Sequence, residues 1–401
     1  MSEPANIPTA SRGVVNVAEI NPYAPRPFTF TEAAICLRDS IRAAGHESEI
    51  FQNRTDITRR TIVLGALPPH LSAVDQLDPA KTVIYNFEQL GNAVAVGGTD
   101  YPKWLQRWLV ADYHSQNIAW LRRQMSDTRH SALRAFELPI VPSPSLRFRP
   151  DLAAPPTVDV LFYGSPNPRR THVLDQLRAA GLSVEVVAGA FAEELAPAIH
   201  RARLVLHVHY FETALFPVAR FLQPVVQGVP VVCETSAFSA QNDWSGSGIV
   251  FAPYDQLVEA CRALLAEPDA TTTERVRQTF NFARSIDFNT PFERLLRALR
   301  QPVAKAIPAP PVPIPAPTGP PAAPQAATQP GDPVDVHTLL SNEEIEAILA
   351  QEAGELPPEA HQSPPPLKMV ERQPGKGRYG ALIVALLLVF SIYTIWMGMR
   401  R

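Results

Sequence analysis

The stretch LVLHVHYFETALFPVARFLQPVVQGVPVVCE, residues 204–234, decides the fold of this chain. An apolar strand signal at 204–208 leads into polar residues, a helix signal covers 215–227, and a second strand signal at 231–233 ends on Glu234. Strand-helix-strand units of this kind build parallel sheets. In open parallel sheets, ligands bind outside the carboxyl ends of the strands. The stretch therefore predicts a binding site as well as a fold.

The same alternation runs through two long parts of the chain. In the first part the strand signals lie at 14–20, 49–51, 61–64 and 82–85, and the helix signals at 31–44, 104–110 and 117–125. In the second part, strand signals at 158–163, 184–187 and 249–251 and helix signals at 169–180, 191–199, 254–265 and 271–299 flank the opening stretch. We expect an α/β protein with two tandem Rossmann-like domains.

A proline-rich segment at 138–156 predicts the connection between these domains. We therefore place an N-terminal Rossmann-like domain at 13–150 and a C-terminal one at 151–300, after a disordered N-terminus at 1–12.

The composition excludes some classes of function. A hydrophobic content of 46% and a charged content of 19% are typical of a globular chain. A net charge of -3 offers no basic surface, so we expect no nucleic acid partner. The three cysteines, Cys36, Cys233 and Cys261, are too widely spaced for a metal site or a disulfide framework. We expect neither a metal ion nor a bound cofactor.

Beyond the two domains, residues 301–378 predict a proline-rich disordered linker, because 18 of the 42 prolines lie there. Inside it, LLSNEEIEAILA at 339–350 predicts a short amphipathic helix over 339–351, with Ser341 and Glu344 forming a capping box. This helix is either a docking peptide for a protein partner or a helix that packs on its own domain.

Residues 379–399, YGALIVALLLVFSIYTIWMGM, contain no charged side chain. A stretch of 21 such residues matches a hydrocarbon core of about 30 Å and predicts a single transmembrane helix. Four basic residues lie in 368–378, and two follow the span at 400–401. This asymmetry favours a tail-anchored protein with its N-terminal domains in the cytoplasm and the lipid bilayer as a partner.

One candidate anion site is YGSPNPRR, residues 163–170. A strand ends there at Gly164, a turn follows, and a helix begins with Arg169 and Arg170. The free backbone N–H groups and the positive end of a helix dipole attract anions, and guanidinium groups pair well with phosphate oxygens. The motif predicts a diphosphate site; the alternative is a solvated arginine pair on an ordinary helix.

The polar tip after the 204–208 strand is a second candidate. His207 and His209 lie two residues apart and point to the same face of the strand, and no third ligand for zinc is spaced around them. They either bind a sugar or phosphate or pack at the strand end. Glu212 either caps the following helix or binds hydroxyl groups. Glu234 ends at the same edge of the sheet, where a carboxylate could hold a ribose.

These motifs resemble GT-B glycosyltransferases, and in particular the bacterial spore-protein glycosyltransferase-like family. That family has a YG strand end and an Asn-x-Arg-Arg turn, matched here by Tyr163, Gly164, Asn167, Arg169 and Arg170. It also has an HYxE tip, a following arginine and a PVVxE strand, matched by His209, Tyr210, Glu212, Arg220 and Glu234. Its IYN-x-EQ and D-Y-S-x-x-N segments resemble 84–90 and 112–117, so the resemblance spans about 14–295.

The resemblance implies a nucleotide-sugar co-substrate bound by those matched residues of the C-terminal domain, and an acceptor bound by the N-terminal domain. It implies a metal-independent transfer in which arginines and helix N-termini stabilise the leaving diphosphate. The candidate catalytic residues are Glu88, His114 and His209, of which Glu88 and His114 are candidate bases. With the predicted span, the resemblance places the protein at the bacterial inner membrane.

Three positions depart from the family pattern. His207 stands where the family has Asn, and Pro217 stands where it often has Glu. Arg220 lies eight residues after Glu212, where some GT-B enzymes have a second carboxylate. These departures support an alternative function: a catalytically degenerate scaffold of the inner membrane that recruits a partner through the helix at 339–351.

Overall fold

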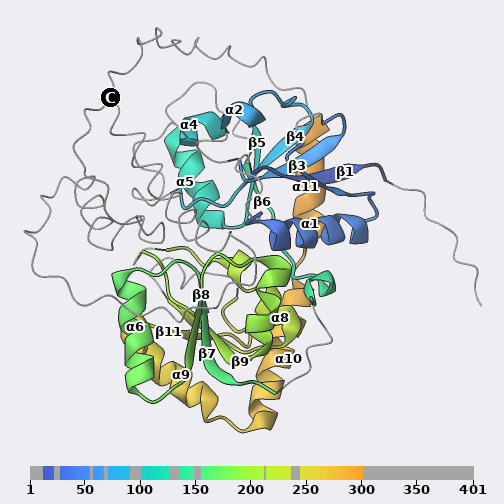
Figure 1. Cartoon of the computed structure of the whole chain (residues 1–401). Coiled ribbons are helices and arrows are strands. Elements are labelled where there is room, and N and C mark those ends of the chain that lie inside the picture. The colour runs from blue at the N-terminus through green and yellow to red at the C-terminus, as the bar shows by residue number, and fades with distance from the viewer. Residues whose placement is uncertain are drawn as a thin grey trace, which may run out of the picture.

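The computed structural model describes residues 12–21, 28–54, 57–66, 71–90, 101–125, 135–148, 155–211, 214–235 and 244–300. Within them the chain forms two parallel β-sheets flanked by helices, one above the other in Figure 1. The two parallel-sheet α/β domains predicted from the sequence are therefore confirmed. The predicted linker, the helix at 339–351 and the span at 379–399 lie outside the described residues. None of the helices in the described part combines the length and apolar character needed to cross a membrane.

The first sheet has the strand order β2-β1-β3-β4-β5-β6, and every neighbouring pair is parallel. Its strands are β1 (Val15–Glu19), β2 (Ile50–Gln52), β3 (Arg60–Leu64), β4 (Thr82–Asn86), β5 (Leu109–Asp112) and β6 (Ala135–Glu137). Its helices are α1 (Thr31–Ala43), α2 (Leu71–Val74), α4 (Tyr101–Leu105) and α5 (Ser115–Met125). The sheet is buried on both faces, as a parallel sheet between helices must be.

The second sheet has the order β11-β10-β9-β7-β8, again parallel throughout. Its strands are β7 (Val158–Tyr163), β8 (Val184–Val187), β9 (Ala202–His207), β10 (Val231–Glu234) and β11 (Val250–Ala252). Its helices are α6 (Pro168–Ala179), α7 (Ala196–His200), α8 (Leu222–Gln227), α9 (Leu257–Leu265) and α10 (Asp269–Ser285).

Two helix predictions were wrong in their extent. The predicted helix at 104–110 is α4 followed by the strand β5, whose residues are all buried. A short apolar run fits a buried strand and a buried helix equally well, which explains the error. The predicted helix at 215–227 is a 3₁₀ turn, Val218–Arg220, followed by α8. Pro217 disfavours helical geometry in Phe216, the residue before it, which explains why no helix includes the start of the predicted range.

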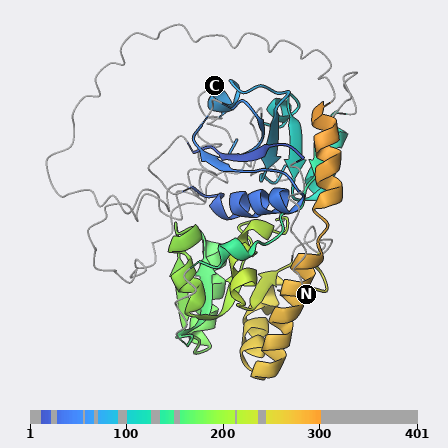
Figure 2. The same cartoon turned by 90° about the vertical axis from the view of Figure 1, so that its right-hand side faces the viewer.

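The last helix, α11 (Asn289–Arg300), packs against β5 and β6 of the first sheet. Figure 2 shows it in orange beside the first domain, although its residues follow the second domain in the chain. Phe292 is fully buried, and its ring lies 5.5 Å from that of His46. These residues belong to the predicted C-terminal domain at 151–300, whereas their contacts are with the N-terminal one.

The carboxyl edges of the two sheets face each other. Glu32, at the start of the helix after β1, accepts hydrogen bonds from the backbone N–H of Ala192 (2.6 Å), which follows β8, and from Gln223 Nε2 (2.9 Å) in α8. Gln89, just after β4, accepts one from the backbone N–H of Leu215 (3.1 Å), which follows β9. The residues after the strand ends therefore lie where the two domains meet.

Candidate functional site

The start of α6 is built by the turn that follows β7. Asn167 is the N-cap, and its side chain accepts a hydrogen bond from the backbone N–H of Arg170 (2.9 Å). Pro168 occupies the first helical position, where its missing N–H costs nothing. Gly164 has a φ of +131°, and a Cβ there would lie 2.7 Å from Arg220 Nη1. Only glycine fits this turn.

Arg170 links the turn after β7 to the residues after β9 by hydrogen bonds. Its side chain is only 3% exposed, with Nε donating to the Val208 carbonyl (3.0 Å) and Nη1 to the Ser165 carbonyl (2.7 Å). The guanidinium carbon lies 5.0 Å from the centre of the Tyr210 ring. Burial lowers the pKa of Arg170 well below its ordinary value. The sequence predicted a phosphate ligand here, and in this structure the guanidinium contacts protein carbonyls.

Arg169 forms a two-pronged ion pair with Glu234 at the end of β10. Arg169 Nη1 donates to Glu234 Oε2 (2.7 Å) and to the His209 carbonyl (3.1 Å), and Nη2 donates to Glu234 Oε1. The His209 backbone N–H also donates to Glu234 Oε2 (2.8 Å). The guanidinium stacks over the Tyr254 ring at 4.0 Å. Glu234, predicted to bind a ribose, has both oxygens engaged within the protein.

The two histidines lie on the same side of the strand end, as their spacing predicted. Their rings are 5.1 Å apart, and His207 Nε2 lies 3.4 Å from His209 Nδ1. Burial, followed by the charges of Arg169 and Arg170, lowers the pKa of His209 to about 3. Burial also holds the pKa of His207 well below its ordinary range. Both rings are therefore neutral near pH 7.

Two buried polar atoms near the start of α6 have unused hydrogen-bonding capacity. Among the described residues, His209 Nε2 and Ser165 Oγ have no hydrogen-bond partner, although these residues are only 1% and 3% exposed. The Tyr210 hydroxyl is also buried without a hydrogen-bond partner among the described residues. An unsatisfied buried polar atom costs about 1–3 kcal/mol, and a polar ligand that bonded these three atoms would remove that cost.

Arg220 and Tyr163 are hydrogen-bonded to each other at the β7–α6 turn. Arg220 Nη1 donates to the Tyr163 carbonyl (2.9 Å), and the Tyr163 hydroxyl donates to the Arg220 carbonyl. Burial lowers the pKa of Arg220, and its interactions with Tyr163 and Glu32 oppose that shift. Arg220 therefore supports the β7–α6 turn in this structure.

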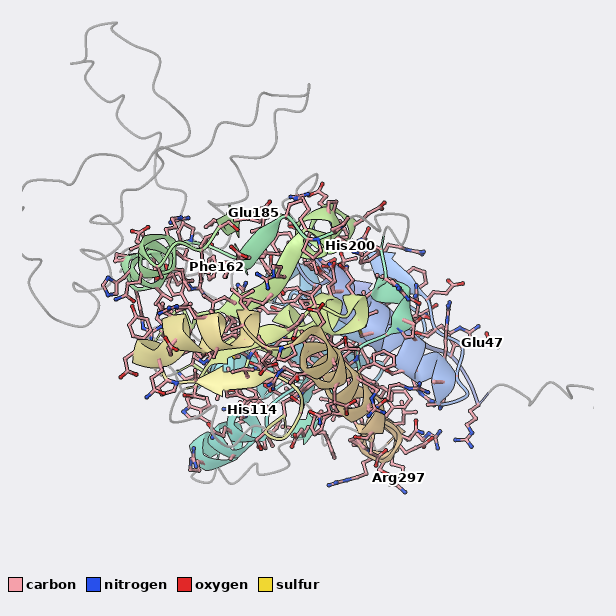
Figure 3. All side chains as sticks on the ribbon, turned by 90° about the horizontal axis from the view of Figure 1, so that it is seen from below. Glu47, His114, Phe162, Glu185, His200 and Arg297 are labelled. Atoms are coloured by element: carbon pink, nitrogen blue, oxygen red, sulfur yellow. The ribbon has the colours of Figure 1, made fainter. Side chains whose placement is uncertain are left out.

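On the first domain, the sequence left Glu88 and His114 open as bases. Burial raises the pKa of Glu88 to about 7, and within the described residues its carboxylate makes no hydrogen bond or ion pair. His114, which follows β5 and is labelled near α5 in Figure 3, accepts a hydrogen bond from the Gln116 backbone N–H on Nδ1 (3.2 Å). The ring nitrogen that accepts this bond carries no proton.

One predicted site residue is not described by the structure, and several residues that the structure places near the site were not predicted. Glu212 lies outside the described residues. Glu32, Gln89, Asn86, Asp112 and Asn117 were not predicted as site residues, although all of them lie near the domain boundary or support it. The two matched segments at 84–90 and 112–117 contain the last four of these residues and were the signal that pointed to them. Within the described part of the chain, no three His, Cys, Asp or Glu side chains are grouped to hold a metal ion.

The chain is only distantly similar to the known proteins that we compared it with. No protein-family model matches it. It is 32% identical over 110 residues to uncharacterized protein L138 of Acanthamoeba polyphaga mimivirus, covering 27% of this chain and 12% of that protein. It is 23% identical over 203 residues to uncharacterized protein L140 of the same virus, covering 48% and 62%. The matches thus span less than two thirds of either relative.

Several solved structures are also similar. WaaG, a glycosyltransferase involved in lipopolysaccharide biosynthesis, matches with a TM-score of 0.44 and 12% identity, covering 70% of this chain and 98% of that one. The α-glucosyltransferase AGT, solved with UDP, matches at 0.46 and 8%, covering 72% and 100%. Anabaena HepE, solved with UDP and glucose, matches at 0.45 and 12%, covering 71% and 99%. Such distant likenesses do not establish a shared activity.

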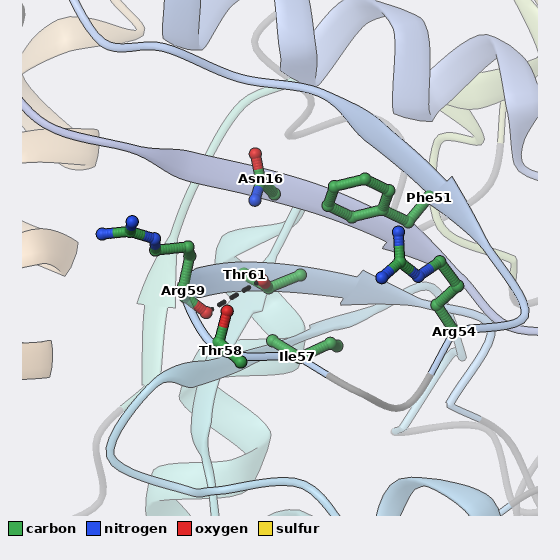
Figure 4. Close-up of a pocket in the computed structure, with 7 residues that line it drawn as sticks. All are labelled: Asn16, Phe51, Arg54, Ile57, Thr58, Arg59 and Thr61. Atoms are coloured by element: carbon green, nitrogen blue, oxygen red, sulfur yellow. Dashed lines mark hydrogen bonds between the residues drawn. The ribbon is translucent and has the colours of Figure 1, made fainter.

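A separate hollow lies on the first sheet beside β1, β2 and β3 (Figure 4). Its lining residues are Asn16, Phe51, Arg54, Ile57, Thr58, Arg59 and Thr61. Its volume is about 90 Å³, whereas pockets for ligands of nucleotide size occupy roughly 300–1,000 Å³. None of the predicted site residues lines it, so the hollow is not a candidate substrate site.

Proposed function

We propose that this chain is a nucleotide-sugar-dependent glycosyltransferase of the GT-B type. The observation that carries the proposal is the start of α6, where a capped helix N-terminus is flanked by the unused polar atoms His209 Nε2 and Ser165 Oγ. Free backbone N–H groups and the helix dipole favour an anion at this position. The matched residues of the spore-protein glycosyltransferase-like pattern surround it.

The donor diphosphate would lie against the first turn of α6. Ser165, in the turn before the helix, would supply a hydroxyl donor. Arg169, 19% exposed, lies at the rim, and the buried charge of Arg170 lies below. These fixed charges and dipoles would stabilise the negative charge that develops on the leaving diphosphate.

Glu88 would be the base on the acceptor side. Its pKa of about 7 suits a group that must accept a proton near neutral pH. In the transfer, the acceptor oxygen bonds to the anomeric carbon as the bond from that carbon to the diphosphate oxygen breaks. The diphosphate leaves with the electron pair, and the proton of the acceptor hydroxyl passes to Glu88.

Calorimetric titration of the full chain with UDP, GDP, dTDP, ADP and their common sugar conjugates tests the proposal. The sharp variant is Ser165→Ala, because it removes an unpartnered buried hydroxyl and no hydrogen bond seen among the described residues. We expect unchanged stability and about ten-fold weaker nucleotide binding. Ser48→Ala is the matched control, because Ser48 Oγ is also buried and unpartnered but lies in the first domain. Equal affinities for the two variants, or no binding by the wild type, would contradict the proposal.

One observation favours a second function, that of a degenerate scaffold. The polar groups of Arg170 and Glu234, both predicted to contact the donor, are engaged with other protein groups. In this account a partner would bind the predicted helix at 339–351. A cellular phenotype that survives Ser165→Ala but disappears when 339–350 is deleted would favour the scaffold over the enzyme.

We further propose that residues 379–399 tether the protein to the bacterial inner membrane with both domains in the cytoplasm. The support is the sequence alone: the uncharged apolar stretch and the basic residues before it. Membrane fractionation of the full chain against a chain ending at residue 378 tests this proposal. Equal membrane association of the two would contradict it.

A further inference from the structure

The two N-terminal segments that resemble the family, 84–90 and 112–117, meet in one buried network. The first follows from β4 into the loop that carries Glu88, and the second begins at the end of β5. Because β4 and β5 are parallel neighbours, with Asn86 paired in register to Asp112, their carboxyl ends lie side by side. The polar residues of the two segments therefore face each other.

Two asparagines form hydrogen bonds with the backbone of this loop. Asn86 Nδ2 donates to the Glu88 carbonyl (2.9 Å), and Asn86 Oδ1 accepts from the Glu88 N–H (3.1 Å). Asn117 Nδ2 donates to the same carbonyl (2.8 Å), and Asn117 Oδ1 accepts from the Leu90 N–H (3.0 Å). Both amide groups thus bind backbone atoms on either side of the Glu88 side chain.

Asp112 holds the two asparagines in place. Its Oδ2 accepts from Asn86 Nδ2 (2.6 Å) and from Asn117 Nδ2 (3.0 Å), and its Oδ1 accepts from the His114 backbone N–H (2.8 Å). Asn86, Asp112 and Asn117 are all almost fully buried. We call these three residues the asparagine clamp. Buried polar networks whose members are satisfied fix a single geometry.

The loop held by the clamp also contacts the second domain. Gln89, the residue after Glu88, accepts a hydrogen bond from the Leu215 backbone N–H (3.1 Å). Leu215 follows the tip that carries His209. The loop therefore has one fixed end on the first sheet and one contact with the donor-side domain.

We propose that the asparagine clamp positions the Glu88 carboxylate against the donor site, with Gln89 setting its register on the second domain. The inference rests on the proposed function, because it assigns Glu88 its role as the base. The two asparagines bind the loop through its backbone, Asp112 binds the asparagines, and none of the three is hydrogen-bonded to the Glu88 carboxylate, so they are positioning residues. A misplacement of about 1 Å at a reacting group can cost a hundred-fold in rate.

Hydrogen exchange followed by mass spectrometry tests the geometry on the full chain. In Asn117→Ala, the Leu90 N–H loses its acceptor, and peptides covering 84–90 should exchange about ten-fold faster. The matched control is Asn16→Ala, because Asn16 is a buried asparagine of the same domain whose Oδ1 accepts from the Glu49 N–H (3.1 Å). It should speed exchange near Glu49 and leave 84–90 unchanged. Unchanged exchange of 84–90 in Asn117→Ala would overturn the clamp.

Hydrolysis of a nucleotide sugar tests the positioning role. The probe is whichever of UDP-glucose, UDP-N-acetylglucosamine, GDP-mannose and dTDP-glucose the wild type hydrolyses, read as released nucleoside diphosphate. For Asn117→Ala we expect kcat to fall about ten- to hundred-fold with KM within two-fold. For Asn16→Ala we expect both constants within two-fold of wild type. Equal losses in the two variants, or no loss in Asn117→Ala, would overturn the inference.

The pH dependence gives a readout that lost stability would not move. The wild-type rate should rise with pH through about 7 as Glu88 loses its proton, and Glu88→Gln should abolish this limb. Tyr101 and Tyr113, which interact with Glu88, have pKa values raised well above 10 by burial and do not titrate there. Burial raises the pKa of Asp112 in the clamp to about 8, so Glu88→Gln is the variant that assigns the limb to Glu88. In Asn117→Ala the limb should shift, and a limb identical to wild type would contradict positioning. A wild type that hydrolyses no nucleotide sugar overturns the proposed function, whereas the exchange result still judges the clamp.

Discussion

Replacing Gly164 with alanine should destabilise the second domain and weaken its proposed donor site. The φ of +131° is a conformation that residues with a Cβ rarely adopt, and the new Cβ would lie 2.7 Å from Arg220 Nη1. Arg220 cannot move freely, because that nitrogen donates to the Tyr163 carbonyl at 2.9 Å. Backbone strain of about 1–3 kcal/mol and one weakened hydrogen bond together predict a loss of about 3 kcal/mol.

Urea unfolding followed by circular dichroism measures this loss, with Gly181→Ala as the matched control. Gly181 also has a positive φ, +85°, but a Cβ there meets no atom within 4 Å. The control therefore isolates backbone strain, for which we expect about 1–2 kcal/mol. The excess over the control combines the contact with Arg220 and any extra strain of the φ of +131°, which the next experiment separates.

A double-mutant cycle identifies that contact directly. In an Arg220→Ala background the clash is gone, so the added cost of Gly164→Ala should fall to its backbone strain alone. If Gly164→Ala costs the same in both backgrounds, the crowding argument is refuted. Gly164→Ala should also lower nucleotide affinity, because it distorts the turn that begins α6.

Two further predictions concern buried carboxyl groups of the first domain. Burial raises the pKa of Glu19 from 4.5 to about 7, so the folded state binds its proton more tightly and stability falls as pH rises through that window, by at most about 3 kcal/mol. Glu19→Gln should therefore match wild type in urea unfolding at pH 4 and exceed it at pH 8; an unchanged pH dependence would contradict the shift. Glu32→Ala should cost about 2 kcal/mol and separate the two domains into distinct calorimetric transitions, because Ala192 and Gln223 lose their shared acceptor. Glu293→Ala, which removes an exposed pair with Arg12, should change stability by less than about 1 kcal/mol and leave one transition.

The fold could be predicted largely because each strand is a short apolar run between turn residues. The strand signal at 158–163 coincides with β7, and that at 184–187 coincides with β8. The errors occurred where a pattern fits two structures, as at 104–110, or where an element is very short, as in β6. The destination of α11 depends on contacts between residues far apart in sequence. No local signal at 289–300 states which domain its apolar stripe covers.

The site was predictable as a location and less so as a set of contacts. Parallel-sheet topology brings the strand ends to one edge, which is why His209, Arg169 and Glu234 meet as expected. The sequence shows that an arginine and a glutamate lie at this edge, but it does not show that they satisfy each other. The sequence also does not show how far a residue lies from the protein surface. Arg170 turns out to be buried, although an arginine is usually a surface residue.

The charge of Arg170 nevertheless argues for an anion above it. Its hydrogen-bond donors contact the neutral carbonyls of Val208 and Ser165, and no ion pair with it is present among the described residues. A buried charge without an ionic partner is costly, and evolution tolerates it mainly where function requires it. Glu234, whose charge also acts on Arg170, is held by Arg169, so that pair contributes little net charge. Among the described residues, the start of α6 therefore combines a helix dipole with a cation that has no ion-pair partner, and the diphosphate that we propose would offset both.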